Sequence, residues 1–471
     1  MSADSPHATE SVAYKKGLQK SVVAGSIGVL VHWFDWAVYA YMATTIAAVF
    51  FPDNDDTAGL LATFAVFAVS FLVRPIGAIL FGRLGDKLGR KLTLSVVILA
   101  MAASTLVLGV LPSYQTIGLL APILLVTTRI VQGLAAGGEF GSAAAFLGEF
   151  SPPKHRGFGC SWLEFGSLLG FLLASFVVYL LNEALSTEQI IAWGWRIPFL
   201  ITVPLGLIGL YIRRRIEDTP EFEALQENET VSQSPLREVF KRNPKQFLQT
   251  CGMETFMNVT FYVVLTYLLT YQETSLGFDA GRAALLSTLA SALGLVIVPL
   301  AGIASDRFGR KPVLMTAAVA LTVLAVPLFM LMGVKSDWAA FASTFGLAFI
   351  LALILGTHAA TVVELFPTRT RQTGLSVAYA LTAALFAGTA PYALTWLIDR
   401  TGSTLSPGFF LALVGIVGII TVISLPETRG IDLLKSGDLE DPPEESSPVE
   451  EPEAQEMQSR TPSPTSPRND H

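Results

Sequence analysis

The chain alternates between long apolar runs and short polar segments, and this pattern sets its structural class. Apolar residues fill runs such as 21–51, 117–150 and 407–426, with most charged residues gathered between them. A helix needs about 20 apolar residues to cross the hydrocarbon core of a bilayer, where it satisfies its own backbone hydrogen bonds. The pattern therefore predicts an all-α membrane protein.

The same pattern predicts twelve transmembrane helices. We expect them at 21–51, 57–81, 92–112, 117–150, 157–181, 193–216, 246–272, 281–304, 312–333, 338–366, 373–398 and 407–426. The first run lacks a clear small-residue cleavage site and carries Asp35 in its middle. It is therefore expected to be a retained helix rather than a removable signal peptide.

Lys and Arg are concentrated in alternate connections between these runs. If the N-terminus lies in the cytoplasm, the outer loops contain only Arg282, Lys335 and Arg400 as basic residues. Cytoplasmic loops of membrane proteins carry an excess of Lys and Arg. We therefore expect a multi-pass protein of the cell membrane with both termini in the cytoplasm.

The spans and the polar segments divide the chain into five parts. We expect a cytoplasmic N-terminal segment at 1–20, a six-helix half at 21–216, a cytoplasmic linker at 217–245, a second six-helix half at 246–427 and a disordered acidic cytoplasmic tail at 428–471. The tail is rich in Glu, Ser and Pro, so it has too little apolar surface to fold alone.

Composition agrees with a membrane protein and argues against several function classes. The chain is 52% hydrophobic and only 15% charged, whereas a soluble protein carries nearer a quarter charged residues. Much of the net charge of −7 lies in the tail, and Cys160 and Cys251 are not expected to form a disulfide. No Gly-x-x-x-x-Gly-Lys-Ser/Thr loop supports an ATP-driven pump. We expect no enzymatic activity, cofactor, metal site or nucleic-acid binding.

Two loops repeat within the chain. The sequence GRLGDKLGRK at 82–91 returns as GIASDRFGRK at 302–311, and Glu149, Pro152 and Arg156 return as Glu364, Pro367 and Arg371 at nearly the same offset. Both repeats predict a duplicated six-helix unit. A simple excess of basic residues does not explain the matching glycines and aspartates, of which the glycines permit a tight turn.

Both loops resemble the signature of the major facilitator superfamily, and Pro426-Glu427-Thr428 resembles its usual ending. The resemblance implies charge contacts on the cytoplasmic side that hold one state closed and break during alternating access. The residues expected to form this cytoplasmic gate are Gly82, Asp86, Arg90, Lys91, Glu149, Arg156, Asp306, Arg310, Glu364 and Arg371.

A narrower resemblance covers nearly the whole chain apart from the tail. The segments RPIG at 74–77, WGWRIPF at 193–199 and EDTPEF at 217–222 resemble the metabolite:proton symporter family. That family includes transporters of proline and betaine, α-ketoglutarate, citrate and shikimate. The segments SWLEFGS at 161–167 and NVTFY at 258–262 look most like its proline/betaine members. His32 replaces the usual Glu, and Arg129 matches the α-ketoglutarate type.

Ionisable residues at membrane depth are costly, and they are the first candidates for a functional site. His32, Asp35 and Tyr39 lie on one face of the first helix, where His32 and Asp35 are predicted to couple transport to protons. Alternatively, His32 only hydrogen-bonds a neighbour. Three further acids, Glu139, Glu164 and Glu254, are also predicted to take part in proton coupling.

Substrate contacts are expected from both halves of the chain. Arg129 is suited to bind a carboxylate by two parallel hydrogen bonds, although it could instead pair with Asp35, Glu139 or Glu164. The remaining predicted contacts are Trp33, Trp162, Asn258 and Tyr262, of which the aromatic rings could hold an ammonium group or simply pack. His358 is a weaker candidate, and Arg74 and Arg196 are interpreted as structural groups near helix ends.

These features favour a proton-coupled symporter that imports a small carboxylate-bearing solute by alternating access. A zwitterionic osmolyte such as proline or betaine is the favoured substrate, and an α-ketoglutarate or citrate type of di- or tricarboxylate is the alternative. A membrane sensor that binds a solute without transporting it is the alternative from another class. The expected partners are the solute, protons and the lipid bilayer, and the protein is expected to function as a monomer.

Overall fold

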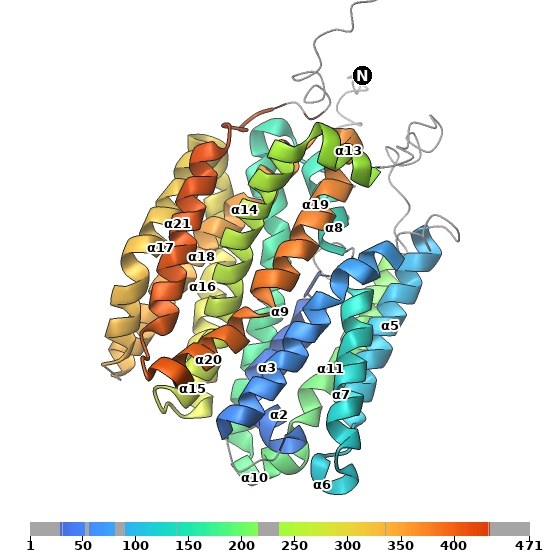
Figure 1. The fold of residues 1–471 in the computed structure, drawn as a ribbon, viewed down its shortest axis with the longest axis vertical. Coiled ribbons are helices and arrows are strands. Elements are labelled where there is room, and N and C mark those ends of the chain that lie inside the picture. Colours follow the sequence, from blue (N-terminus) through green and yellow to red (C-terminus); the bar gives the residue numbers. More distant parts are fainter. Residues whose placement is uncertain are drawn as a thin grey trace, which may run out of the picture.

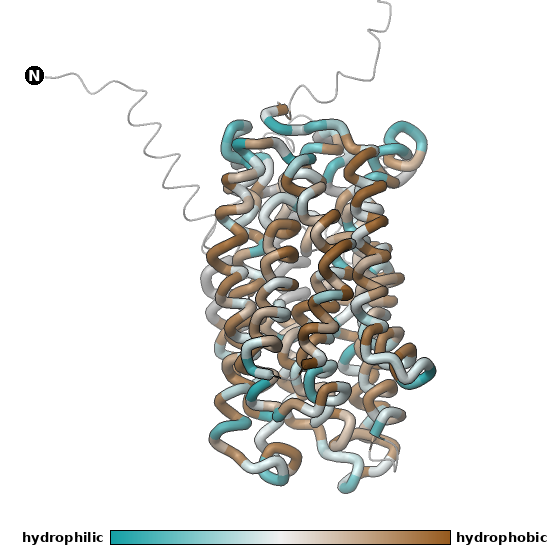
Figure 2. The backbone as a smooth tube through the Cα atoms, turned by 90° about the vertical axis from the view of Figure 1, so that its left-hand side faces the viewer, coloured by the Kyte–Doolittle hydropathy of each residue, from teal (hydrophilic) through white to brown (hydrophobic). Residues whose placement is uncertain are grey.

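The structure, a computed structural model, describes residues 29–30, 32–51, 56–80, 90–137, 139–214, 235–334, 336–431 and 433. The described residues are almost entirely helical and include no strand. Their helices run side by side in an elongated bundle (Figure 1). Apolar residues dominate the long middle of the bundle and hydrophilic residues collect at its two ends (Figure 2).

The first part of the chain forms helices up to residue 214. They are a helix at 32–41, α2 (Ala43–Phe50), α3 (Asp56–Leu72), a continuation at 74–80, α5 (Arg90–Val110), α6 (Tyr114–Ile117), α7 (Leu120–Ala135), α8 (Glu139–Phe150), the 3-10 turn η1 (Pro153–His155), α9 (Arg156–Ala184), α10 (Thr187–Gln189), the π-helix η2 (Ile190–Gly194) and α11 (Arg196–Arg214).

The second part begins at residue 235. It forms α13 (Pro235–Arg242), α14 (Pro244–Phe261), the π-helix η3 (Tyr262–Tyr267), α15 (Leu268–Thr274), α16 (Ala280–Phe308), α17 (Arg310–Met332), α18 (Asp337–Leu365), α19 (Thr368–Thr382), the π-helix η4 (Ala383–Ala387), α20 (Ala390–Thr401) and α21 (Ser406–Ser424).

Seven of the described helices are long and apolar enough to cross a membrane. They are Asp56–Leu80, Pro153–Ala184, Ala280–Phe308, Arg310–Met332, Asp337–Leu365, Thr373–Thr401 and Ser406–Ser424, and a pair bent by 46°, Thr187–Gly194 with Arg196–Leu207, forms an eighth if it is one span. All eight overlap spans expected from the sequence. The all-helical membrane architecture is therefore confirmed, whereas the number twelve stays a prediction.

The expected span at 117–150 is wrong as a single uninterrupted helix. Gly118 has a φ of 60°, which separates α6 from α7. The helix stops again at Ala135, and α8 starts at Glu139. An apolar run in the sequence therefore does not guarantee one straight helix.

A glycine within α7 and another just after it allow a neighbouring helix to approach very closely. A Cβ atom on Gly133 would lie 2.0 Å from the backbone oxygen of Ser70, and one on Gly137 would lie 2.3 Å from that of Arg74. Side chains at these positions would push the span Asp56–Leu80 away. Gly133 and Gly137 therefore permit close packing of this span against α7 and the residues just after it.

Helices from the two parts of the chain also pack against one another. The most extensive of these contacts joins α9 to α16. In addition, α8 contacts α19 and α3 contacts α20. α13 falls inside the expected linker 217–245 but packs on α19, where the Thr370 hydroxyl donates to Asn243 Oδ1 at 3.3 Å. The C-terminal end of the expected linker is therefore a packed helix.

Candidate functional site

A buried ion pair joins the first described helix to α7. Arg129 Nη1 lies 3.8 Å from Asp35 Oδ2, and both side chains are almost fully buried. Gln132 Nε2 donates to the same Asp35 oxygen at 3.1 Å and to Thr105 Oγ1 at 2.8 Å. Of the three alternatives for Arg129, the structure places Asp35 beside it.

The Arg129 side chain is enclosed by aromatic rings. Its guanidinium carbon lies 3.8 Å from the centre of the Tyr39 ring and 5.7 Å from that of Trp36. A separation of 3.8 Å from Asp35 is too long for a hydrogen bond, so the pair is held by charge. Because a buried charge is stabilised chiefly by its partner, each member of this pair depends on the other.

A second charged cluster lies where α9, α14 and α18 meet. His358 Nε2 lies 3.2 Å from Glu254 Oε1, and His358 Nδ1 lies 3.9 Å from Glu164 Oε1. Asn258 Nδ2 donates to Glu254 Oε2 at 3.3 Å. The structure thus brings together two acids predicted separately and a histidine that was only a weak candidate. We call Glu164, Glu254 and His358 the acid–histidine cluster.

The predicted aromatic contacts do not form one site. Trp33 and Tyr262 lie together, with ring centres 6.1 Å apart, and both are buried. Trp162 instead packs against Phe158 and Phe165. The His32 ring packs against Trp33 and Trp36 at 5.4 and 5.9 Å.

A small cavity lies between these groups. His32, Trp33, Arg74, Phe140 and Tyr379 are among its lining residues. It has room for about one or two water molecules. A solute as large as an amino acid therefore enters only if the lining helices move apart.

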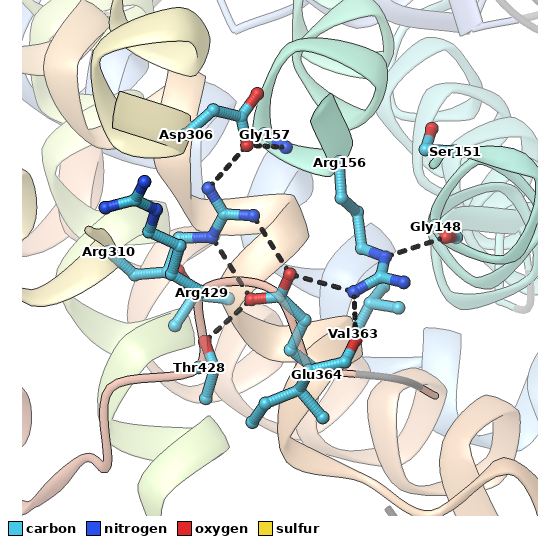
Figure 3. A network of polar contacts seen from close by, with 12 residues as sticks. Gly148, Ser151, Arg156, Gly157, Asp306, Arg310, Val363, Glu364, Thr428 and Arg429 are labelled. Atoms are coloured by element: carbon cyan, nitrogen blue, oxygen red, sulfur yellow. Dashed lines mark hydrogen bonds and ion pairs between the residues drawn. The ribbon is translucent and has the colours of Figure 1, made fainter. Parts of the chain in front are cut away.

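One end of the bundle is closed by a charged network that links distant parts of the chain (Figure 3). Arg310 donates to Glu364 from Nε at 3.1 Å and from Nη2 at 2.9 Å, and Arg156 Nη1 reaches Glu364 from the other side at 3.1 Å. The Thr428 hydroxyl donates to the same carboxylate at 2.7 Å. We call Arg156, Asp306, Arg310, Glu364 and Thr428 the charged-end network.

Asp306 ties α16 to the beginning of α9. Its two carboxylate oxygens accept hydrogen bonds from the backbone N–H groups of Gly157 and Phe158, both at 2.8 Å. Arg310 Nη1 also donates to Asp306, at 2.7 Å. A carboxylate at a helix N-terminus satisfies free N–H groups and interacts favourably with the helix dipole.

The repeated Glu and Arg residues pair crosswise between the two repeats. Arg156 pairs with Glu364, and Arg371 Nη1 donates to Glu149 at 2.8 Å. Gly82 and Asp86 lie outside the described residues. Arg90, Lys91 and Glu139 are described only as helix positions, so no contact is assigned to their side chains.

The expected tail boundary at 427 is too early. Besides Thr428, the Ile431 carbonyl accepts a hydrogen bond from Arg156 Nη1 at 2.9 Å, and the Leu433 side chain is buried. These contacts belong to the packed structure, because buried polar groups of the network need partners. The rest of the expected tail, 434–471, lies outside the described residues.

The opposite end of the bundle has a polar contact of its own. The Thr44 hydroxyl donates to Glu273 Oε2 at 3.2 Å, which joins α2 to α15. Glu273 follows the expected span 246–272. Burial raises the pKa of Glu273 to about 8, the hydrogen bond from Thr44 lowers it, and Asp279 raises it.

The folded protein is expected to lose stability as pH rises through the titration of Glu273, because burial disfavours the charged carboxylate. The pKa of this carboxyl is about 8 when buried and 4.5 in its ordinary state, so its contribution to stability is fully present below pH 4.5 and is lost by pH 8. The melting temperature of Glu273→Gln should therefore match that of the wild type at pH 5 and exceed it increasingly up to pH 8. The exposed Glu183, replaced by Gln, provides the control. A constant difference across this range would contradict the assignment.

Several residues of the site were missed or misread from the sequence. Glu273 and Asp35's partner Gln132 were not predicted as site residues, and Thr428 was recognised only as part of the Pro426-Glu427-Thr428 ending. Arg74 was interpreted as structural, yet it lines the cavity. The sequence signal for Arg74 was the presence of an arginine within an apolar span, because such a residue is a functional candidate by default.

Comparison with known proteins places the chain among transporters. The family model for sugar (and other) transporters matches residues 21–437. The proline/betaine transporter of Salmonella typhimurium is 38% identical over 424 residues, which cover 87% of this chain and 84% of that protein. The glycine betaine/proline/ectoine/pipecolic acid transporter of Dickeya dadantii is 38% identical over 421 residues, with the same shares covered.

The fold is also found among solved structures. The proton:xylose symporter XylE bound to 6-bromo-6-deoxy-D-glucose superposes with a TM-score of 0.74, covering 90% of this chain and 99% of that one. Sequence identity to it is only 19%. At that level the similarity establishes the fold alone.

Proposed function

The chain belongs to the sugar (and other) transporter family of the major facilitator superfamily, and on that premise we propose that it is a proton-coupled symporter. It imports a small carboxylate-bearing solute across the cell membrane by alternating access. The favoured solute is a zwitterionic osmolyte such as proline or betaine, which the relatives named above are described as carrying.

The buried ionisable clusters carry this proposal. Asp35 with Arg129, and Glu254 and Glu164 with His358, lie inside an apolar bundle. Such groups are expensive within a membrane and are retained where ions or protons are moved. Protonation of a carboxylate in either cluster would release its basic partner, and a proton would then favour one conformation over the other.

The charged-end network supports alternating access. Glu364 holds Arg156 from the first part of the chain and Arg310 from the second, so separation of the two parts must break these pairs. This end is assigned to the cytoplasm, and the Thr44–Glu273 end to the outside. The cavity between them is then reached from one side at a time.

The proposal includes the wider topology. Twelve helices form two six-helix halves at 21–216 and 246–427, joined by the cytoplasmic segment 217–245. Internal repeats of this kind place the binding site at the interface of the halves near the membrane midplane. Both termini lie in the cytoplasm, and the protein acts as a monomer.

Uptake into vesicles tests this function directly. Purified protein in lipid vesicles should accumulate labelled proline or glycine betaine when the outside is acidic, and accumulation should vanish when a protonophore removes the gradient. Empty vesicles provide the control. Labelled α-ketoglutarate and citrate test the alternative substrates in the same assay.

Each component of the proposal can fail separately. Uptake of zwitterions that is unaffected by the pH gradient would contradict proton coupling. Accumulation of only α-ketoglutarate or citrate would replace the substrate class. Binding of a solute without any uptake would favour a sensor.

A further inference from the structure

Arg74 differs from the other buried arginines of the described structure because it lacks a carboxylate partner there. Arg129 pairs with Asp35, Arg156 and Arg310 pair with Glu364, and Arg371 pairs with Glu149. Arg74 is only 2% exposed, and its Nε and Nη2 atoms donate to no described group. Tyr262 and Tyr379 are neutral hydrogen-bond partners of Arg74. A guanidinium without a carboxylate partner is costly inside a membrane protein, so a bound anion would stabilise it.

The orientation of Arg74 is fixed by aromatic packing. Its guanidinium carbon lies 4.3 Å from the centre of the Trp36 ring and 4.0 Å from that of the Phe71 ring. Stacking occupies the faces of the planar group and leaves its N–H edges available for hydrogen bonds. Two parallel N–H donors match the geometry of a carboxylate.

The cavity lies beside Arg74 rather than beside Arg129. Arg74 lines the cavity with His32, Trp33, Phe140 and Tyr379, and it also lines an adjacent second cavity with Phe140, Ser376 and Tyr379. Arg129 lines neither of these two cavities and stands against Tyr39 and Asp35. Arg74 is therefore the guanidinium that a solute meets.

Acidic side chains lie near Tyr379, one of the residues that line the cavity. Tyr379 lies close enough to Arg74, Glu254 and Glu164 to interact with all three electrostatically. Phe140 stacks on Tyr379 with ring centres 4.2 Å apart and lies 6.1 Å from the His358 ring. Arg74 and the acid–histidine cluster thus both lie near the aromatic rings of Phe140 and Tyr379 that line the cavity.

We propose that Arg74, and not Arg129, binds the carboxylate of the solute, with the ammonium group lying over Phe140 and Tyr379 toward Glu254 and Glu164. This inference rests on the proposed function and names its substrate class. The site selects a zwitterion with one carboxylate and one ammonium group. A dicarboxylate is disfavoured, because its second carboxylate would face the two glutamates.

Matched ligands with and without a carboxylate test this assignment. Binding of glycine betaine and of choline, which keeps the quaternary ammonium but has no carboxylate, is measured by calorimetry on the purified full-length protein. The wild type should bind glycine betaine more tightly than choline. In Arg74→Gln the affinity for glycine betaine should fall about 10- to 100-fold, the loss expected for a charged hydrogen-bonded contact. The affinity for choline should not fall.

A second variant keeps the test decisive if Arg74→Gln does not fold. Arg74→Lys retains the charge but not the planar pair of donors, so it should lose part of the preference for glycine betaine. Arg196→Lys, at an arginine that lines neither cavity, is the matched control and should retain the full preference, and Arg129→Lys tests the competing assignment.

The outcomes separate the two proposals. If the wild type prefers glycine betaine and the Arg74 variants keep that preference, the assignment of Arg74 is overturned while the transport function stands. If an Arg129 variant alone loses the preference, Arg129 is the carboxylate ligand. If the wild type binds no zwitterion, proline included, both the substrate class and the role of Arg74 are overturned.

Discussion

Glu364→Gln is expected to open the charged end of the protein. Glu364 accepts hydrogen bonds from Arg156, Arg310 and Thr428, and neutralising it leaves two buried guanidinium groups with too little negative charge. Breaking a buried pair costs about 3–5 kcal/mol. Because glutamine keeps one acceptor oxygen, we take the lower value, which shifts the equilibrium about 100-fold toward separation.

The native Cys160 thiol reports this opening. Cys160 lies on α9 beside the network and is 1% exposed, so a thiol reagent should react slowly in the wild type. In a background where Cys251 is replaced by Ser, Glu364→Gln should raise the rate of Cys160 labelling about 100-fold, in line with the shifted equilibrium.

Glu427→Gln is the matched control. This exposed carboxylate lies at the same end but accepts only from the backbone N–H groups of Arg310, Lys311 and Arg429 among its described contacts. Its replacement should change labelling by only a few fold. Equal labelling of Cys160 in Glu364→Gln and the wild type would show that this network does not keep the charged end closed.

Asp35→Asn is expected to uncouple transport from protons. Asp35 is the only described carboxylate that pairs with Arg129, and asparagine cannot take up and release a proton. Accumulation driven by an acidic exterior should fall to the level without a gradient. Exchange of labelled for unlabelled solute across the membrane needs no net proton movement and should remain.

The acid–histidine cluster is the alternative location of the proton site. If Asp35→Asn accumulates solute as the wild type does while Glu254→Gln loses accumulation and keeps exchange, the proton site lies at His358 and its two acids. The exposed Asp56, replaced by Asn, is the control and should behave as the wild type in both assays.

Helical periodicity predicted which residues face inward better than it predicted their partners. Asp35 and Arg129 were both expected to face the interior, yet three acids were possible partners for the arginine. A single sequence gives the direction of a side chain on its own helix, but distance across the bundle depends on how helices cross. Gly133 and Gly137 mark one such crossing in the structure, because the lack of a side chain lets a neighbouring helix come close.

The errors arose where a helix is interrupted. The span at 117–150 was expected to continue through Gly118 and beyond Ala135, but α7 begins after Gly118 and ends at Ala135. Arg74 lies between Val73 and Pro75, where α3 gives way to the continuation at 74–80. Proline removes a backbone hydrogen bond and bends the helix, so a residue that counts as near a helix end in the sequence can point into the cavity.

The hydrogen bonds of Thr428 and Ile431 determine where the chain can be shortened without harm. On a hydropathy profile, cuts directly after the last helix and a few residues further on look equivalent. The first would remove the hydroxyl that supports Glu364 and the carbonyl that holds Arg156. The second, after Leu433, would keep both. The residues up to Leu433 therefore support the charged-end network, and a reporter attached after Leu433 would lie close to it.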